Sequence, residues 1–150
     1  MIKTIVLSMC LATSALSLNA RAQDRRGYSY GPVTLVQYIH VYYGQFDEYM
    51  KWVTSTWLPT MKAEKKAGII IGYKVVQSSP KSPDDANLYL EITFKNMAAY
   101  AGDMGDKEDA FEAVTETVIC SSECQNQARV QRNKLRKALG TEVTREITFE

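Results

Sequence analysis

Residues 35–44, LVQYIHVYYG, contain the only histidine of the chain, His40, with tyrosines on both sides. An imidazole beside a carboxylate has its charged form favoured and can act as a general acid or base. Tyrosine rings supply flat apolar walls and hydroxyl groups, which suit a small, partly apolar ligand. Tyrosines are also enriched at protein interfaces, where they need no chemistry. Three roles for His40 therefore stay open: catalysis, ligand contact and a structural polar contact.

Strand alternation predicts which side chains accompany His40. Residues 32–43, PVTLVQYIHVYY, are rich in β-branched and aromatic residues and predict a strand. Further strands are predicted over 69–77, 87–94 and 142–150. Because successive side chains of a strand point to opposite faces, one face of the sheet is expected to combine tyrosine, histidine and carboxylates. The members of this group are Tyr38, His40, Tyr42, Tyr89, Glu91 and Glu146, with Lys74 at the edge.

The opposite face of the predicted sheet is apolar and is expected to pack on helices. Its residues are Val33, Leu35, Ile39 and Val41, then Leu88, Leu90, Ile92 and Phe94, then Val143, Ile147 and Phe149. Two polar residues, Gln37 and Arg145, fall in the same rows and fit them poorly.

Helical periodicity fills the segments between the strands. Apolar residues recur at spacings of three and four at Phe46, Met50, Val53, Trp57 and Met61. Pro59 lies inside this helix and is expected to kink it, because proline removes one backbone donor. Asn96 is expected to cap a short helix. Further helices are predicted over 106–120 and 123–139, the second closed by Gly140.

The resulting order of elements is β-α-β-β-α(α)-β. This order is typical of an α+β, ferredoxin-like βαββαβ sandwich with an extra helix and a four-stranded antiparallel sheet. The first strand would lie in the middle, between the third and the fourth. Helices on one face leave the other sheet face uncovered, and a partly apolar uncovered face commonly packs against a partner. We therefore expect a homodimer.

The first 22 residues have the features of an export signal. Lys3 precedes an apolar run, and Ala20-Arg21-Ala22 resembles a signal-peptidase site. The run is too short and too polar to be a transmembrane anchor. We expect a signal peptide at 1–22, a flexible arm at 23–31 and a single domain at 32–150, in a periplasmic or secreted protein with no membrane span after cleavage. Cleavage would change the formal net charge from +1 to −1, which gives no electrostatic reason to expect a nucleic-acid partner.

Cleavage would also remove Cys10 and leave Cys120 and Cys124. Two cysteines in an exported protein suggest a disulfide. Within one regular helix this spacing would strain the bond, so two free thiols stay an alternative. The spacing C-x3-C without a second pair does not predict a metal site. The sequence contains no phosphate-binding glycine loop, G-x-S-x-G or H-E-x-x-H motif, and no cofactor is expected.

Three stretches together resemble a family of short exported bacterial proteins with the dimeric α+β barrel fold. They are FDEYMKWVTSTWLPTMKAEKKAGIIIGYKVV, SPDDANLYLEITFKNMAAY and KLRKALGTEVTREITFE, and the resemblance covers most of residues 33–150. It implies fold and export, but no catalytic residues. The wider group includes cofactor-independent monooxygenases, muconolactone isomerase-like enzymes, haem enzymes and ligand-binding modules. Haem members use a proximal histidine, and placement of His40 on a strand argues against haem here.

Three functions follow from these patterns. The first is binding of a small apolar or aromatic molecule in a sheet-lined pocket, with Tyr38, Tyr42, Tyr89 and Lys74 as ligand-binding residues. The second is a cofactor-independent monooxygenase or isomerase that uses His40 with Glu91 or Glu146. The third is a dimerisation or interaction module without catalysis.

Overall fold

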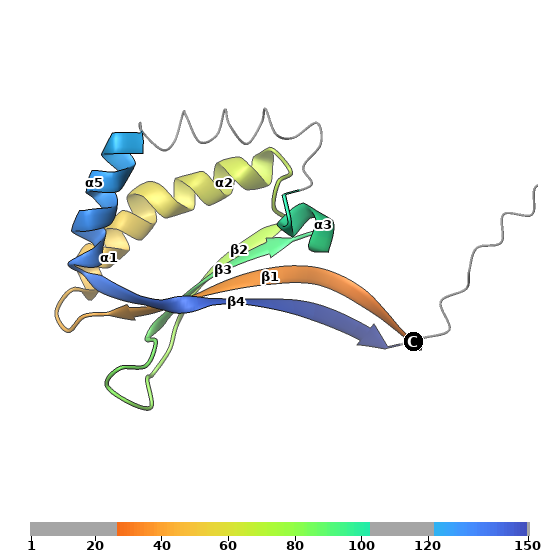
Figure 1. The fold of residues 1–150 in the computed structure, drawn as a ribbon, viewed down its shortest axis with the longest axis horizontal. Helices are drawn as coiled ribbons and strands as arrows, with labels where there is room; N and C mark the ends of the chain where they lie inside the picture. The colour runs from red at the N-terminus through yellow and green to blue at the C-terminus, as the bar shows by residue number, and fades with distance from the viewer. Residues whose placement is uncertain (1–26, 103–121, 150) are drawn as a thin grey trace, which may run out of the picture.

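The computed structural model describes residues 27–102 and 122–149, which form a four-stranded antiparallel sheet with helices on one face (Figure 1). The strands are β1 (Tyr28–Val41), β2 (Gly72–Gln77), β3 (Leu88–Phe94) and β4 (Arg136–Phe149). The helices are α1 (Phe46–Trp52), α2 (Leu58–Lys66), α3 (Met97–Tyr100) and α5 (Ser122–Asn133). The sheet order is β2-β3-β1-β4, with every neighbouring pair antiparallel. The predicted ferredoxin-like fold class is confirmed by this topology.

The core lies between the helices and the central strands β1 and β3. Register pairs Val33 with Phe94 and Ile39 with Leu88, so the apolar rows of the two strands share one face. Ile39, Leu88 and Leu90 are each 1% exposed. The apolar rows predicted for these two strands are therefore confirmed.

The first helical segment is interrupted where proline predicted a disturbance. A π-helical turn, Val53–Trp57, separates α1 from α2, and Pro59 stands in the first turn of α2. A π-turn relocates backbone hydrogen bonds, which accommodates the donor that proline lacks. Val53, Trp57 and Met61 are buried as predicted. Tyr49, which the periodicity did not single out, is fully buried as well.

Several predicted boundaries are wrong, and the strand predicted over 69–77 begins only at Gly72. Residues 28–31 of the expected flexible arm belong to β1 instead, and Tyr28, Ser29 and Tyr30 pair with the end of β4. The last helix ends at Asn133 rather than at Leu139, and β4 begins at Arg136. Residues KLRKAL favour a helix by propensity, but pairing of 136–138 with β1 overrides this local preference.

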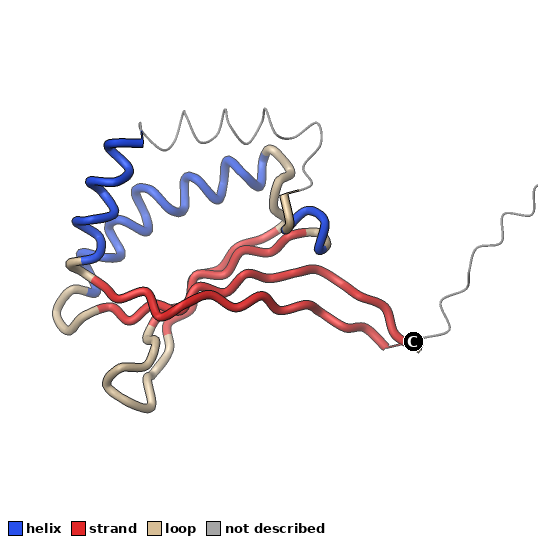
Figure 2. Tube along the Cα trace, in the orientation of Figure 1, coloured by secondary structure: helices blue, strands red, loops and turns tan. Residues whose placement is uncertain are grey.

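The apolar row of β4 is not covered by the helices, contrary to expectation. Register places Val143 opposite Leu35, so the row does lie on the helix side of the sheet. Nevertheless Val143, Ile147 and Phe149 are 39%, 48% and 76% exposed. The ends of β1 and β4 extend beyond β2 and β3 as a two-stranded ribbon that no described helix covers (Figure 2).

Several predictions fall on residues outside the described ranges. They are the signal peptide at 1–22, the helix at 106–120 and the thiol of Cys120. Cys124 is disulfide-bonded, and its predicted pairing with Cys120 stays a prediction. No helix of the described residues is long and apolar enough to cross a membrane.

Candidate functional site

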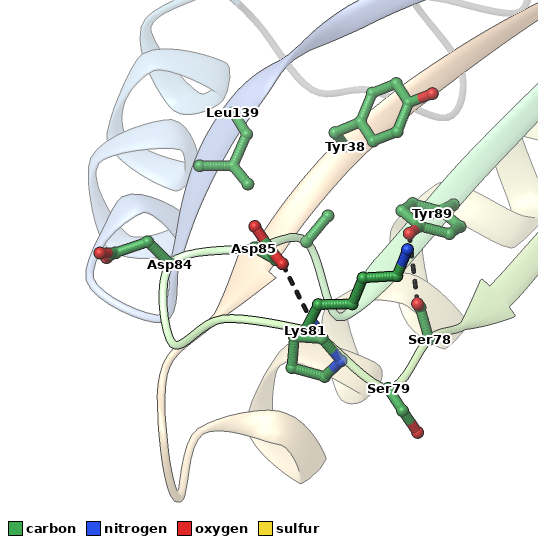
Figure 3. A pocket seen from close by; sticks show the side chains of 10 residues that line it. Tyr38, Ser78, Ser79, Lys81, Asp84, Asp85, Tyr89 and Leu139 are labelled. Carbon is green, nitrogen blue, oxygen red and sulfur yellow. Dashed lines mark hydrogen bonds between the residues drawn. The ribbon is translucent and has the colours of Figure 1, made fainter.

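A cleft of about 370 Å³ opens on the sheet face that the helices leave uncovered (Figure 3). The loop between β2 and β3 projects from this side of the sheet, opposite the helices (Figure 1). Tyr38 of β1 and Tyr89 of β3 border the cleft from the sheet, and Leu139 of β4 lies at its end. The loop supplies the other wall with Ser78, Ser79, Pro80, Lys81, Asp84, Asp85 and Ala86.

The two tyrosines are direct cross-strand partners and hold each other in place. Their rings meet edge to face with centroids 5.2 Å apart, an arrangement that aromatic pairs prefer. The Tyr38 hydroxyl donates a hydrogen bond of 2.5 Å to the Glu142 carboxylate, and the Tyr89 hydroxyl donates one of 3.2 Å to Ser78 Oγ. Both rings are therefore oriented before any ligand arrives.

The hydrogen bond between Tyr38 and Glu142 also has an electrostatic effect. Accepting this bond, the Glu142 carboxylate raises the pKa of Tyr38 above its ordinary value, and burial adds to the shift. The hydroxyl is thus kept protonated as a donor at neutral pH. Tyr38 is consequently unsuited to act as a base in this arrangement.

The loop wall is built by its own polar side chains. The Asp85 carboxylate accepts hydrogen bonds from the backbone N–H groups of Lys81 and Ser82, at 3.1 and 2.8 Å. Hydrogen bonds from Ser82 lower the pKa of Asp85 below its ordinary value. Asn87 closes the base of the loop, because its side chain bonds both the N–H and the C=O of Val41. The loop is therefore a folded turn tied to the end of β1.

His40 takes part in the same attachment. Its Nδ1 lies 2.8 Å from the backbone oxygen of Asp85. A carbonyl oxygen only accepts, so Nδ1 carries the proton, and in the neutral ring Nε2 is left as the acceptor. His40 lies on the uncovered sheet face, as predicted. It contacts the loop at Asp85, which lines the cleft, but does not line the cleft itself. Its observed contact is structural: it positions the Asp85 segment.

The two carboxylates that were expected near His40, Glu91 and Glu146, lie far from it within one chain. Glu91 is paired with Val36 of β1, which at about 3.3 Å per residue lies about 13 Å along the strand from His40. Glu146 lies against Gly31, about 30 Å along β1 from His40. Its expected place beside the histidine is wrong, because alternation predicts the face of a strand residue but not its position along the strand.

Two further predicted residues stand at the margins. Lys74 of β2 is paired with Glu91 on the uncovered face. Because β2 is an edge strand, Lys74 lies at the edge of the sheet, outside the cleft. Tyr42 follows the end of β1, is 39% exposed, and its ring lies 5.9 Å from that of His40. Neither residue lines the cleft.

Sequence reasoning missed Leu139 and Glu142, and the position of Leu139 follows from an irregularity of β4. Register pairs Tyr38 with Gly140 but Ile39 with Ala138, which leaves Leu139 as the extra residue of a β-bulge. Gly140, with φ of 142°, adopts a backbone conformation that favours glycine. Glu142 is the first residue of the strand predicted over 142–150 and shares the alternation of Glu146, so the same pattern could have placed it in the group.

The described residues contain no group of three His, Cys, Asp or Glu side chains placed to hold a metal ion. The polar residues that line the cleft are Tyr38, Tyr89, Ser78, Ser79, Lys81, Asp84 and Asp85. Such a set can orient a small molecule through hydrogen bonds and charge.

Comparison with known proteins finds similarity in structure alone. No protein-family model and no curated protein matches the chain. HapK from Hahella chejuensis is 14% identical over 76% of this chain and 91% of its own, with a TM-score of 0.47. Two dimeric ferredoxin-like proteins from an uncultured marine organism are 12% and 6% identical, over 80% and 81% of this chain and 96% and 90% of their own. Their TM-scores are 0.47 and 0.48.

Proposed function

We propose that the protein binds a small apolar or aromatic molecule in the cleft between the Tyr38–Tyr89 pair and the 78–87 loop. One observation carries this proposal: two preoriented aromatic rings border a cleft of about 370 Å³, within the usual range for small-molecule sites. Leu139 and Pro80 add apolar surface, while Lys81 offers a charge that can orient a polar substituent. Because the rings are already held in place, little ordering entropy is lost on binding.

The test is a titration of the full chain with simple aromatic compounds, such as phenol and indole, followed by calorimetry. We expect Tyr38→Ala and Tyr89→Ala to weaken binding by about tenfold or more, the loss expected when an aromatic wall is removed. Tyr43→Ala is the matched control, because Tyr43 is fully exposed and lies outside the cleft. Absence of binding across a broad aromatic panel would contradict the proposal and favour the interaction-module function.

We further propose a homodimer in which a second copy of the chain covers the exposed apolar row of β4 on the helix side of the sheet. The homodimeric α+β barrel, in which the second copy covers the opposite, uncovered face, stays the alternative arrangement. The exposed side chains of Val143, Ile147 and Phe149 support this, since exposed apolar surface of this kind commonly marks an interface. Light scattering at micromolar concentration should give twice the chain mass. Phe149→Glu should shift the protein toward monomer, whereas Tyr43→Glu should not. A strictly monomeric wild type would contradict this.

Export through the segment 1–22 is also part of the proposal. Protein recovered from its native envelope should begin at Gln23, which N-terminal sequencing or mass spectrometry can establish. An intact N-terminus on that protein would exclude cleavage after Ala22.

Catalysis by His40 with Glu91 or Glu146 stays a prediction that no observed contact favours. It requires oxygen consumption or product formation that disappears in His40→Ala. If activity instead persists in that variant, His40 serves the loop alone.

A further inference from the structure

A second cluster of polar side chains lies away from the cleft, where α5 gives way to β4 and both approach α1 (Figure 1). Arg132 is in the last turn of α5, and Arg136 is the first residue of β4. The guanidinium of Arg132 stacks over the Trp52 ring at 4.3 Å, and that of Arg136 lies 5.8 Å from the centre of the Tyr49 ring. Two positive charges are thus held side by side against the aromatic residues of one helix.

Three polar atoms of this cluster have no hydrogen-bond partner although solvent does not reach them. They are Nε of Arg132, Nε of Arg136 and the hydroxyl oxygen of Tyr49. Tyr49 as a whole is 0% exposed. Buried polar atoms are nearly always satisfied in native proteins, so three unsatisfied ones together require an explanation.

Charge makes the cluster more unusual still. Neither arginine forms an ion pair with a residue that the structure describes. Within residues 27–102 and 122–149, the observed ion pair joins Lys51 and Glu48. Burial, and then the neighbouring charge of Arg136, lower the pKa of Arg132. Guanidinium groups nevertheless stay charged at neutral pH. The aromatic rings compensate for part of the desolvation, but both Nε–H donors stay without a hydrogen-bond partner.

We propose that Arg132, Arg136 and Tyr49 form a binding site for a small carboxylate anion, separate from the cleft and independent of the function proposed for it. The Nε–Nη edge of a guanidinium matches the two oxygens of a planar carboxylate. Two such edges supply donors to both oxygens, and the Tyr49 hydroxyl supplies one more. A bound carboxylate would neutralise the repulsion between the arginines and satisfy all three unpartnered atoms. Small shifts of the two partly buried arginine side chains would admit it.

The site is tested by titrating the full chain with acetate, phosphate and chloride at equal ionic strength. Binding is followed by calorimetry and by tryptophan fluorescence, because Trp52 stacks on Arg132. We expect saturable binding of acetate that is weakened about tenfold in Arg132→Gln and in Arg136→Gln. Tyr49→Phe, which removes one donor and keeps the ring, should weaken it about threefold. Arg145→Gln is the matched control, because Arg145 also stacks on a tyrosine, Tyr30 at 3.8 Å, but lies far along β4.

Substitution by lysine covers the case in which the glutamine variants do not fold. Arg132→Lys and Arg136→Lys retain the positive charge but lose the paired N–H donors of the guanidinium. Each variant should therefore bind acetate at least about fivefold more weakly than the wild type. An equal response to chloride would show general screening and overturn the site. Tighter binding of phosphate than of acetate would overturn the carboxylate assignment, and unchanged binding in both arginine variants would overturn the location.

Discussion

Strands β3 and β4 carry the same apolar alternation, yet their exposure is opposite. Leu88 and Leu90 of β3 are each 1% exposed, whereas Ile147 and Phe149 of β4 are 48% and 76% exposed. Both rows belong to the helix side of the sheet. The difference arises because α1 and α2 lie over the central strands and leave the far part of β4 uncovered (Figure 1). Alternation therefore defines the face of a side chain, but not whether anything covers that face.

The largest effect expected from this contrast is on stability. Leu90→Ala should lower the free energy of unfolding by about 2–5 kcal/mol, because it leaves a cavity in the core. Ile147→Ala should change it by less than about 1 kcal/mol, because the side chain is half exposed. Urea denaturation at low protein concentration measures both. Equal losses of unfolding free energy in the two variants would mean that Ile147 is as well covered in solution as Leu90. The difference in exposure between β3 and β4 would then hold only for the isolated chain.

A smaller effect is expected at the bulge that sets Leu139 against the cleft. Gly140→Ala should lower the free energy of unfolding by about 1–3 kcal/mol, since alanine is strained at φ of 142° although its Cβ would meet open space. Gly72→Ala in β2 is the control. There a Cβ would make an ordinary contact with Thr93 at 3.7 Å, so little change is expected. Thermal denaturation of the pair separates backbone strain from packing, and equal shifts would argue against strain at the bulge.

The smallest expected effect is on the pKa of Tyr38, whose hydroxyl bonds Glu142 of β4. Glu142→Gln should lower the pKa of Tyr38 toward the ordinary value of 10.0, because the carboxylate that accepts its hydrogen bond is the main cause of the raised pKa. Glu91→Gln should have a weaker effect in the same direction, because Glu91 contributes last among the causes. The ultraviolet absorbance of tyrosinate during a pH titration, with Tyr38→Phe to assign the signal, measures both shifts.

The sign of the linked stability follows from this shift. Because the folded-state pKa of Tyr38 is raised, the protonated hydroxyl stabilises the folded protein below pH 10, and this contribution is lost as the pH rises through the raised pKa. In Glu142→Gln the folded-state pKa lies closer to the ordinary value, so this contribution should be smaller and its loss should be complete at a lower pH. An unchanged alkaline profile would indicate that the hydrogen bond is not kept in solution.

Much of the fold could be predicted because it depends on local patterns. The rows of β1 and β3, the stripe of the first helix and the Asn96 cap all arise from periodicity or from a single side chain, and Asn96 Oδ1 does accept the hydrogen bond of Ala99 N. The end of α5 could not be predicted in the same way. Residues after Asn133 have helical propensity, and only their pairing with β1 makes them a strand.

The candidate site was predictable only in part, for the same reason. Tyr38 and Tyr89 were placed on one face by alternation, and their pairing confirmed it. The loop wall could not be predicted, because its position depends on a turn closed by Asp85. Which carboxylate of β4 bonds Tyr38 could not be predicted either, because it depends on the strand register. The proximity of Glu146 to His40 was predicted wrongly, since alternation fixes the face but carries no information about position along the strand.

The sequence by itself determined the order of elements, the sheet face of each strand residue and hence the uncovered face on which His40 and the tyrosines lie. These depend on the periods of 2 and 3.6 residues, which are properties of the backbone. Tertiary structure alone decided which residues meet: that His40 holds the loop through Asp85, that Glu142 rather than Glu146 bonds a tyrosine, and that Arg132 and Arg136 converge on α1. Register, bulges and helix contacts between distant segments set these distances, and none of them is encoded in a local pattern.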